Sequence, residues 1–457
     1  MGADGSPSKN EITPTVVSSA GRAIRGRRDE ILYLAAERFA SAGYSETSLQ
    51  HIADAGGVLP GSLYHHFESK EAIAEELIRE YHTELEVLGR SVLTRSGPDS
   101  MLAIYDSLLG LVTAIAESSF RHQAAVRLSI YEFAAGDRPA GKTPKGEVSS
   151  IELALREMIA RGREVGLVRS TVDPDVFSQQ LYTAIRRVGV SDPSHAARVP
   201  DLAGTLLHIL LGGVASKTPA DPLLDRSDAV CAAKDRLRMW RLEPNGSADE
   251  KSAQVHSAAR SEFARRGYEA ATIRDIAKAA GMSNGSLYRI VDSKETLLRT
   301  IMASYYSHLS TAYKVVMAAG SGVIEQIDAL LWVNIKAMDM FSAEFEIQHS
   351  WIRQTPPSVD ISSDALNREI LQIGDLIAGG LRSGDLRVWE VDSSIPSSDL
   401  VIAAMHNLLW LPVDIIEKSG CRSALRHSRR TTLRGAGPTR LGKAIGPRTG
   451  SRASRPS

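Results

Sequence analysis

The sequence carries two copies of a short polar segment whose residue types suit binding rather than bond-making. GSLYHHFESKE spans residues 61–71 and GSLYRIVDSKE spans residues 285–295. Both offer hydroxyls, a lysine and a glycine at the same spacing; such groups donate hydrogen bonds or let a backbone approach a ligand closely. The sequence shows no phosphate-binding glycine loop, nucleophile elbow or acid–base set. We therefore expect no catalytic residues and no enzyme.

Metal and disulfide chemistry are not expected either. His51, His65 and His66 lie close together in the sequence, but adjacent helical residues point to different faces, and no carboxylate or thiol completes a ligand set. Cys231 and Cys421 lie far apart and lack neighbouring ligand residues. The sequence predicts no cofactor and no metal.

The polar segments belong to a longer internal repeat. Residues 43–71 align without a gap with residues 267–295, and 13 of the 29 positions are identical. Such self-similarity over a domain-sized offset indicates a duplicated structural unit.

Each copy predicts three helices that would position the polar residues. In the first copy these are 28–41, 48–55 and about 59–66, with Thr47 and Ser48 as caps and Gly57 in the turn. The second copy repeats the pattern with Thr272 as cap and Gly281 in the turn. The expected inward-facing residues are Leu49, Ile52, Ala53, Val58, Leu63 and Phe67 in the first copy and Ile273, Ile276, Ala277, Met282, Leu287 and Val291 in the second. Two short helices joined by a glycine turn are typical of the helix-turn-helix that reads DNA.

The two segments also resemble a known signature. GSLYHHFESKEAI and GSLYRIVDSKETL are similar to the junction between the recognition helix and the fourth helix of TetR-family repressors. RGREVGLVRSTVDPD (161–175) and LRSGDLRVWEVD (381–392) resemble that family's regulatory domain. The second copy departs from the pattern at Ile290 and Val291, where the family usually has an aromatic residue or His followed by Phe.

The resemblance implies which residues contact the DNA backbone. Tyrosine hydroxyls, lysines at the start of the fourth helix and capping hydroxyls would bind phosphates and set register without reading sequence. The candidates are Ser48, Tyr64 and Lys70 in the first copy and Thr272, Tyr288 and Lys294 in the second. A packing role for the tyrosines and a solvated surface charge for the lysines remain open.

Base recognition is expected on the exposed face of the second and third helices. Arginine suits guanine, and asparagine or glutamine suits adenine. The candidates are Gln50, Pro60, Gly61, Ser62 and His65 in the first copy and Arg274, Asn284, Gly285, Ser286 and Arg289 in the second. The two copies therefore differ where bases would be read.

Charge is distributed unevenly along the 457 residues. The formal net charge is zero, but eleven of the 54 Lys and Arg follow residue 417, where no Asp or Glu occurs, so the preceding residues carry −11. Arg22, Arg25, Arg27 and Arg28 add a basic arm, which would enter an adjacent groove or neutralise phosphates. The basic tail either adds nonspecific DNA affinity or serves only as a solvated extension.

The overall pattern predicts an all-α protein with two TetR-like units. No targeting segment or long apolar span is evident, so a cytoplasmic protein with no membrane partner is expected. We expect these divisions: a disordered arm (1–26), a first helix-turn-helix domain (27–90), a first regulatory domain (91–215), a linker (216–250), a second helix-turn-helix domain (251–315), a second regulatory domain (316–417) and a disordered basic tail (418–457).

The resemblance further implies a small effector and a dimer-like arrangement. Aromatic and Met side chains of the second regulatory domain would surround a small apolar effector or form plain core: Trp332, Met338, Phe341, Phe345, Trp351 and Trp410. Because family members normally dimerise, we expect residues 176–213 to pack against helices near 361–417 as an internal pseudo-dimer, with further homodimerisation left open.

These expectations combine into a regulator that binds double-stranded DNA. The resemblance favours a repressor released by its effector and reading an imperfect palindrome. Two alternatives remain: an effector-independent or architectural DNA-binding protein, and a protein whose second head is structural only.

Overall fold

The computed structural model describes residues 26–44, 47–57, 59–94, 100–129, 149–189, 198–240, 250–268, 271–351, 363–389 and 395–438. Within these ranges the protein is all-helical, as predicted, and the only extended pairing is one antiparallel bridge between Ala215 and Leu386. Residues 1–25 of the predicted arm, which include Arg22 and Arg25, lie outside the described residues, as does Val58.

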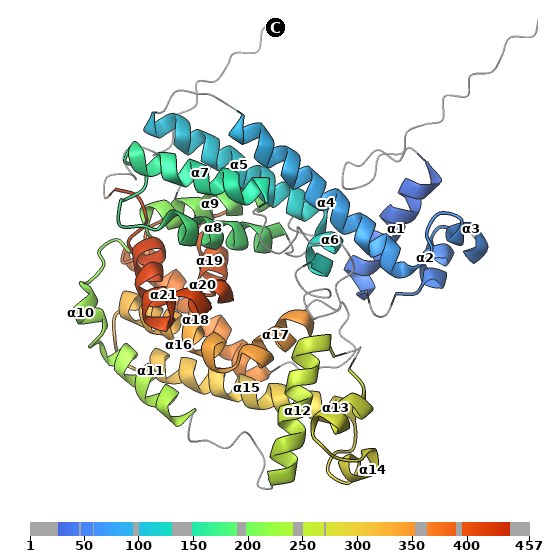
Figure 1. Cartoon of the computed structure of the whole chain (residues 1–457). Helices are drawn as coiled ribbons and strands as arrows, with labels where there is room; N and C mark the ends of the chain where they lie inside the picture. Colours follow the sequence, from blue (N-terminus) through green and yellow to red (C-terminus); the bar gives the residue numbers. More distant parts are fainter. Residues whose placement is uncertain are drawn as a thin grey trace, which may run out of the picture.

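The first unit consists of a small three-helix head and a larger bundle (Figure 1). The head contains α1 (Arg27–Ala42), α2 (Leu49–Ala55) and α3 (Pro60–Tyr64). The bundle contains α4 (Lys70–Leu93), α5 (Met101–Arg121), α6 (Gln123–Arg127), α7 (Ser150–Glu164), α8 (Pro174–Gly189) and α9 (Val199–Gly212). α4 packs on α7, and α5 packs on α8 and α9.

The second unit repeats the order of a head followed by a bundle. Its head contains α12 (Glu250–Arg266), α13 (Ile273–Ala279) and α14 (Asn284–Leu287). Its bundle contains α15 (Lys294–Met317), α16 (Val323–Met340), α17 (Ser342–Trp351), α18 (Asp364–Ser383), α19 (Ser397–Leu408) and α20 (Val413–Ser419). Both heads project from the same side of the molecule (Figure 1).

Helix α5 is the only described helix that is long and apolar enough by itself to cross a membrane. It packs against α4, α7, α8 and α9, and Leu108, Val112 and Ile115 are buried. Burial by these neighbours explains its apolar character as that of a central bundle helix.

The prediction of a linker over residues 216–250 is wrong for most of that segment. It contains α10 (Asp221–Leu224) and α11 (Asp228–Met239), and only residues 241–249 fall outside the described ranges. α11 packs along α15 and α16 and buries Val230, Ala233 and Leu237. The turn-forming residues at both ends of the segment obscured this amphipathic helix.

The prediction of a disordered tail is wrong for residues 418–438. This stretch forms α21 (Cys421–Ser428) and a π-helical turn, η3 (Arg429–Leu433). Arg429 is only 2% exposed; its Nε donates to Asp328 at 2.7 Å and its Nη2 donates to Asp225 at 2.8 Å. Burial opposes the charge of Arg429, but these hydrogen bonds outweigh it and raise the pKa of the guanidinium. The segment is therefore part of the core.

The segment after η3 also crosses the end of the first unit. The backbone N–H groups of Ala436 and Gly437 donate to Leu210 and Leu211, each at 2.7 Å. Gly213 and Gly435 have φ angles of 78° and 80°, and a Cβ on Gly435 would lie 2.3 Å from the carbonyl carbon of Gly212. Glycine is thus required where the two backbones meet.

The two units share an interface built by α8 and α9 against α19 and α20. α19 packs chiefly on α9, and both α19 and α20 contact α8. The Asn407 amide donates to the Ala184 carbonyl at 2.9 Å, and the Arg187 guanidinium donates to the Trp410 carbonyl at 2.9 Å. The side chains that cross the interface thus satisfy buried backbone carbonyls of the opposite unit.

Because of two buried histidines at this interface, we expect the folded protein to lose stability in mild acid. His208 stacks between Tyr105 of its own unit and Trp389 of the second, and His427 bonds to the Gln180 amide across the interface. Burial lowers the pKa of each histidine to about 4. Both are therefore neutral in the folded protein, whereas the unfolded chain gains protons below its ordinary histidine pKa of about 6.5.

The contribution of these two neutral histidines to the free energy of unfolding is accordingly complete above about pH 6.5 and is lost as the pH falls toward about 4. The loss is up to about 3 kcal/mol for each histidine. Urea denaturation at a series of pH values checks this: His208→Gln and His427→Gln should each flatten the profile in that window. An unchanged slope in both variants would contradict the assignment.

Candidate DNA-binding site

The second helix of each head starts with a reciprocal cap. Ser48 accepts a hydrogen bond from the His51 N–H at 3.1 Å, and the His51 ring accepts from the Ser48 N–H at 3.3 Å. In the second head Thr272 accepts from the Asp275 N–H at 3.1 Å and donates its hydroxyl to the Asp275 carboxylate at 2.6 Å. These bonds from Thr272 lower the pKa of Asp275. Both hydroxyls that the family resemblance places on phosphates are thus engaged in capping.

The turn between the second and third helices depends on glycine. Gly57 and Gly281 have φ angles of 59° and 64°, a conformation that other residues adopt rarely. Leu63 and Leu287 are fully buried beneath the third helix, and Phe67 and Val291 follow them into the core. The inward-facing set predicted from the sequence is buried, with Leu49, Ile273 and Met282 half-buried and Val58 not described.

Tyr64 and Tyr288 lie on the outer surface of the heads. Their side chains are 57% and 58% exposed, although each follows a buried leucine. A large aromatic side chain at that exposure contributes little to the core, so its packing role is small. Both phenols are therefore accessible to a ligand that approaches the outer surface of the head.

Lys70 and Lys294 occupy matching, half-buried positions. Each ammonium donates to a backbone carbonyl at the end of the first helix, from Lys70 to Tyr44 at 2.8 Å and from Lys294 to Tyr268 at 2.9 Å. Each also lies over the ring of the same tyrosine, 4.1 Å and 4.2 Å from the centroid. The lysines therefore join the fourth helix to the head, and a phosphate would share the ammonium with this carbonyl.

The base-reading candidates differ between the heads in structure as well as in sequence. In the first head Gln50 donates to Asp54 at 2.6 Å, His65 is exposed, and the side chain of Pro60 is not described. In the second head Arg274 and Asn284 are exposed, and the Arg289 guanidinium donates to the Gly285 carbonyl at 3.2 Å.

The small residues at the start of the third helix leave its surface open. A Cβ added to Gly61 or Gly285 would meet no atom within 4 Å. Ser62 and Ser286 beside them are half-buried, and the Ser286 hydroxyl lies 3.0 Å from that of Ser283. An unobstructed helix start of this kind allows close approach to a DNA groove.

Leu59 is a candidate contact that sequence reasoning missed. It precedes α3 and is 81% exposed. The equivalent residue of the second head is Ser283, which caps α14 by accepting from the Ser286 N–H at 3.2 Å. An exposed leucine at a helix start suits apolar contact with a thymine methyl group. The difference between Leu59 and Ser283 at equivalent positions of the repeat was the sequence signal that could have identified this contact.

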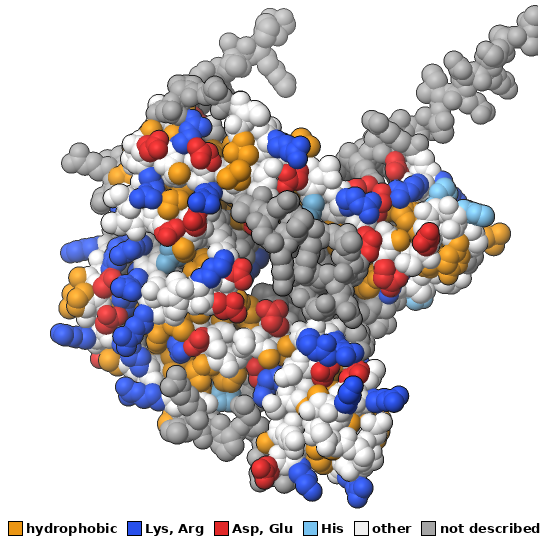
Figure 2. All heavy atoms as spheres, viewed as in Figure 1, with side chains coloured by type: hydrophobic (Ala, Val, Ile, Leu, Met, Phe, Trp, Pro, Cys, Tyr) orange, Lys and Arg blue, Asp and Glu red, His pale blue; other side chains and the backbone are white. Residues whose placement is uncertain are grey.

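The two arginines at the start of α1 pair with carboxylates. Arg28 bonds to Glu76 at 2.6 Å and lies over Phe67, and its hydrogen bond lowers the pKa of Glu76. Arg27 pairs with Glu30 at 2.6 Å. These arginines therefore bind carboxylates of the chain itself. Figure 2 shows Lys and Arg side chains projecting from the second head and His side chains from the first.

Each head is fastened to its bundle by an arginine. The Arg127 guanidinium of α6 donates to the Ala40 carbonyl at 2.8 Å in the first unit. In the second unit Arg260 of α12 forms an ion pair with Glu344 of α17 at 2.5 Å, and Glu344 is buried. A shift of α6 or α17 would thus move the attached head.

The aromatic cluster predicted to hold an effector is largely part of the core. Met338, Phe341 and Phe345 are buried; Phe341 packs against Trp240 and Tyr305, and Phe345 stacks on Trp410. Trp332 lines a cavity, and the side chain of Trp351 is not described. The described residues contain no group of three or more His, Cys, Asp or Glu that could hold a metal ion.

Comparisons with known proteins match both heads. A family model described as bacterial regulatory proteins, tetR family, matches residues 31–77 and 256–301. HTH-type transcriptional repressor KstR2 of Rhodococcus jostii (strain RHA1) is 33% identical over 199 residues, 42% of this chain and 92% of that protein.

The similarity extends to a receptor and to a solved structure. The A-factor receptor protein of Streptomyces griseus is 26% identical over 251 residues, 53% of this chain and 83% of that protein. The structure of the ketosteroid transcriptional regulator KstR2 of Mycobacterium tuberculosis aligns with a TM-score of 0.35 at 22% identity, covering 41% of this chain and 94% of that one.

Proposed function

Because the chain belongs to the tetR family of bacterial regulatory proteins, we propose that it is a tandem form in which one chain carries two complete DNA-binding units. It is a DNA-binding transcriptional regulator, as its relatives are. The tandem form is supported by the two matches to the family model and by the order of helices, in which a head is followed by a bundle in each unit.

Both heads bind a single DNA site in this proposal. They project from the same side of the molecule (Figure 1), and each exposes one tyrosine and an unobstructed helix start. Tyr64 and Tyr288 contact phosphates, while Ser48, Lys70, Thr272 and Lys294 hold the reading helices in place and approach the backbone. The exposed tyrosine pair is the observation that carries the proposal.

The internal interface replaces a dimer in this proposal. α8 and α9 of the first unit pack against α19 and α20 of the second, and residues 429–438 cross both units. One chain then presents two heads at a fixed separation, as a symmetric dimer would. Homodimerisation is not needed for a complete site.

The operator is an imperfect palindrome because the heads are not identical. Leu59, Gln50 and His65 face DNA from the first head, whereas Arg274, Asn284 and Arg289 face it from the second. Apolar and amide groups favour A·T pairs, and arginines favour G·C pairs. We therefore propose that the second half-site is richer in guanine.

The regulator represses transcription and releases DNA on binding a small effector in the cytoplasm. Its relatives include a transcriptional repressor and a receptor protein, which supports repression that responds to a ligand. The links from α6 and α17 to the heads provide a route by which a change in a bundle would alter head spacing.

Footprinting on DNA selected by the full-length protein tests the proposal. We expect protection of one discrete site with two unlike halves on the same face of the duplex. A matched duplex with the second half-site scrambled should lose protection over both halves. Diffuse coverage without a preferred site would instead indicate an architectural DNA-binding protein.

A further inference from the structure

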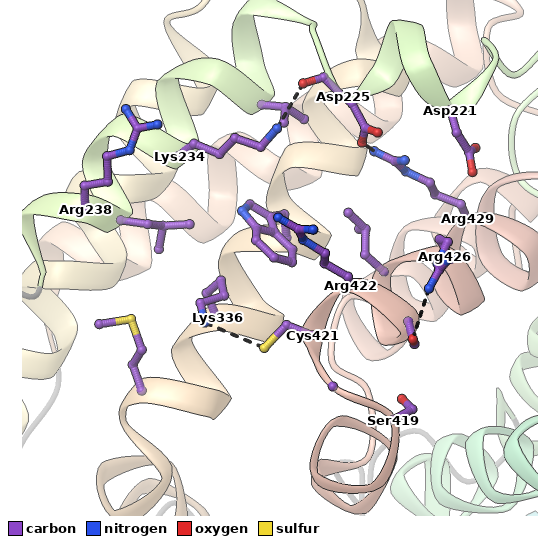
Figure 3. Close-up of a pocket in the computed structure, with 17 residues that line it drawn as sticks. Asp221, Asp225, Lys234, Arg238, Lys336, Ser419, Cys421, Arg422, Arg426 and Arg429 are labelled. Carbon is purple, nitrogen blue, oxygen red and sulfur yellow. Dashed lines mark hydrogen bonds and ion pairs between the residues drawn. The ribbon is translucent and has the colours of Figure 1, made fainter.

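A cavity of 1180 Å³ lies between α11, α16 and the C-terminal segment 419–429. Six cationic side chains line it, against two carboxylates, Asp221 and Asp225. The cations are Lys234, Arg238, Lys336, Arg422, Arg426 and Arg429. In Figure 3, Lys234 and Arg238 come from one wall and Arg422 and Arg426 from the opposite wall.

Three of these cations are neutralised by carboxylates. Arg429 pairs with Asp328 and Asp225, Lys336 pairs with Asp339, and Arg238 pairs with Asp235 at 2.6 Å. The lining therefore retains positive charge only if the other three cations lack such partners.

Two of the other three bond to neutral groups. Lys234 donates to the Asp225 backbone carbonyl at 3.0 Å, and Arg426 donates to the Ser423 hydroxyl at 3.2 Å. Arg422 extends into the cavity between these walls (Figure 3) and has no carboxylate within ion-pair distance among the described residues. Asp221, the remaining lining carboxylate, pairs with Arg434 outside the cavity. The cavity is thus electropositive, and an anion would be attracted to it.

The remaining wall is apolar. Val230 and Leu237 of α11 face Trp332 and Met340 of α16, and Leu425 of α21 completes the lining. Trp332 is half-buried, so its indole offers a flat surface for an aromatic or aliphatic group. A cavity of this size accommodates a small organic molecule.

We propose that this cavity binds an amphipathic anion, with its apolar body against Trp332 and its carboxylate or phosphate held by Arg422, Arg426 and Lys234. The charge of the lining distinguishes this ligand from the apolar effector expected from the aromatic residues. The site is built by α11 and α21, both outside the segments that match the family model. The inference does not depend on DNA binding.

Calorimetry on the full-length chain without DNA tests the proposal with naphthalene-2-carboxylate, 2-naphthyl phosphate and the neutral naphthalene-2-carboxamide. We expect at least one of the two anions to bind ten or more times more tightly than the amide, and to quench tryptophan fluorescence. Comparable binding of all three probes, or no binding of either anion at millimolar concentration, would overturn it.

A charge-neutralising variant identifies the site. The double variant Arg422→Gln/Arg426→Gln should weaken binding of the anion by at least tenfold, and Trp332→Phe should remove most of the fluorescence change. The control Arg90→Gln/Arg382→Gln removes two exposed cations that do not line the cavity and should bind normally. Equal affinity in the Arg422/Arg426 variant and this control would overturn the assignment, while failure of footprinting alone would not affect it.

Discussion

Replacing Arg429 with alanine should destabilise the protein by about 3 to 5 kcal/mol, the usual cost of removing one partner from a buried ion pair. Arg429 is 2% exposed, and both of its bonds to Asp328 are 2.7 Å long. The variant leaves the Asp328 carboxylate, which is completely buried, without its counter-ion. Burial raises the pKa of Asp328 even in the intact pair, so the unpaired carboxylate would take up a proton or admit water.

Urea denaturation measures this effect, and the adjacent arginine provides the control. Arg430 is exposed and donates only to the Thr171 carbonyl at 3.2 Å, so Arg430→Ala should cost under about 1 kcal/mol. The double variant Asp328→Leu/Arg429→Met removes both charges and should recover much of the loss. Similar small effects for Arg429→Ala and Arg430→Ala would show that residues 418–438 are not part of the core.

Placing leucine at Gly61 or Gly285 should weaken DNA binding by about 100-fold or more, equivalent to about 2.7 kcal/mol. A leucine at the start of the reading helix would occupy the space needed for close approach to the groove. Folding should be unaffected, because a Cβ at either position meets no atom within 4 Å and neither glycine has a positive φ.

Gel-shift titration of the wild type and the two single variants measures the contribution of each head. Gly110→Leu serves as the control for leucine on the surface, because Gly110 is exposed on α5 of the first bundle, lacks a positive φ, and a Cβ there would meet no atom within 4 Å. Both head variants should lose affinity if both heads bind. A large loss for Gly61→Leu with wild-type affinity for Gly285→Leu would mean that the second head only completes the fold.

The heads were predictable because their structure is determined locally. Capping residues, the turn glycines and the buried leucines lie within about 25 residues of one another in each copy. The duplication gave the same pattern twice, so Gly57 and Gly281 could be recognised together. Capping by Ser48 was predicted, but the carbonyl that Lys70 binds became visible only in three dimensions, since Tyr44 lies 26 residues earlier.

The C-terminal segment was not predictable from its own composition. Its arginines suggest a solvated tail, yet the partners of Arg429 are Asp328 and Asp225, 101 and 204 residues earlier in the chain. No local pattern encodes such pairs. α11 is different, because its apolar residues Ala229, Val230, Ala233 and Leu237 recur at helical spacing and were detectable in principle.

The residues that line the cavity could not be predicted from the sequence for a third reason. Trp332 was identified as an aromatic candidate, but its neighbours in sequence, Met338 and Phe341, turn toward the core. The lining instead comes from Lys234 on one side and Arg422 on the other, in segments that the sequence suggested were linker and tail. Only the packing of α11 and α21 on α16 reveals the charge of the cavity.

The central claim is that one chain supplies both heads for one operator. Size-exclusion chromatography with multi-angle light scattering, on the full-length protein bound to its footprinted duplex, tests it most directly. We predict one chain per duplex, and one chain per particle in the absence of DNA. A stable complex containing two chains on one operator would contradict the internal pseudo-dimer.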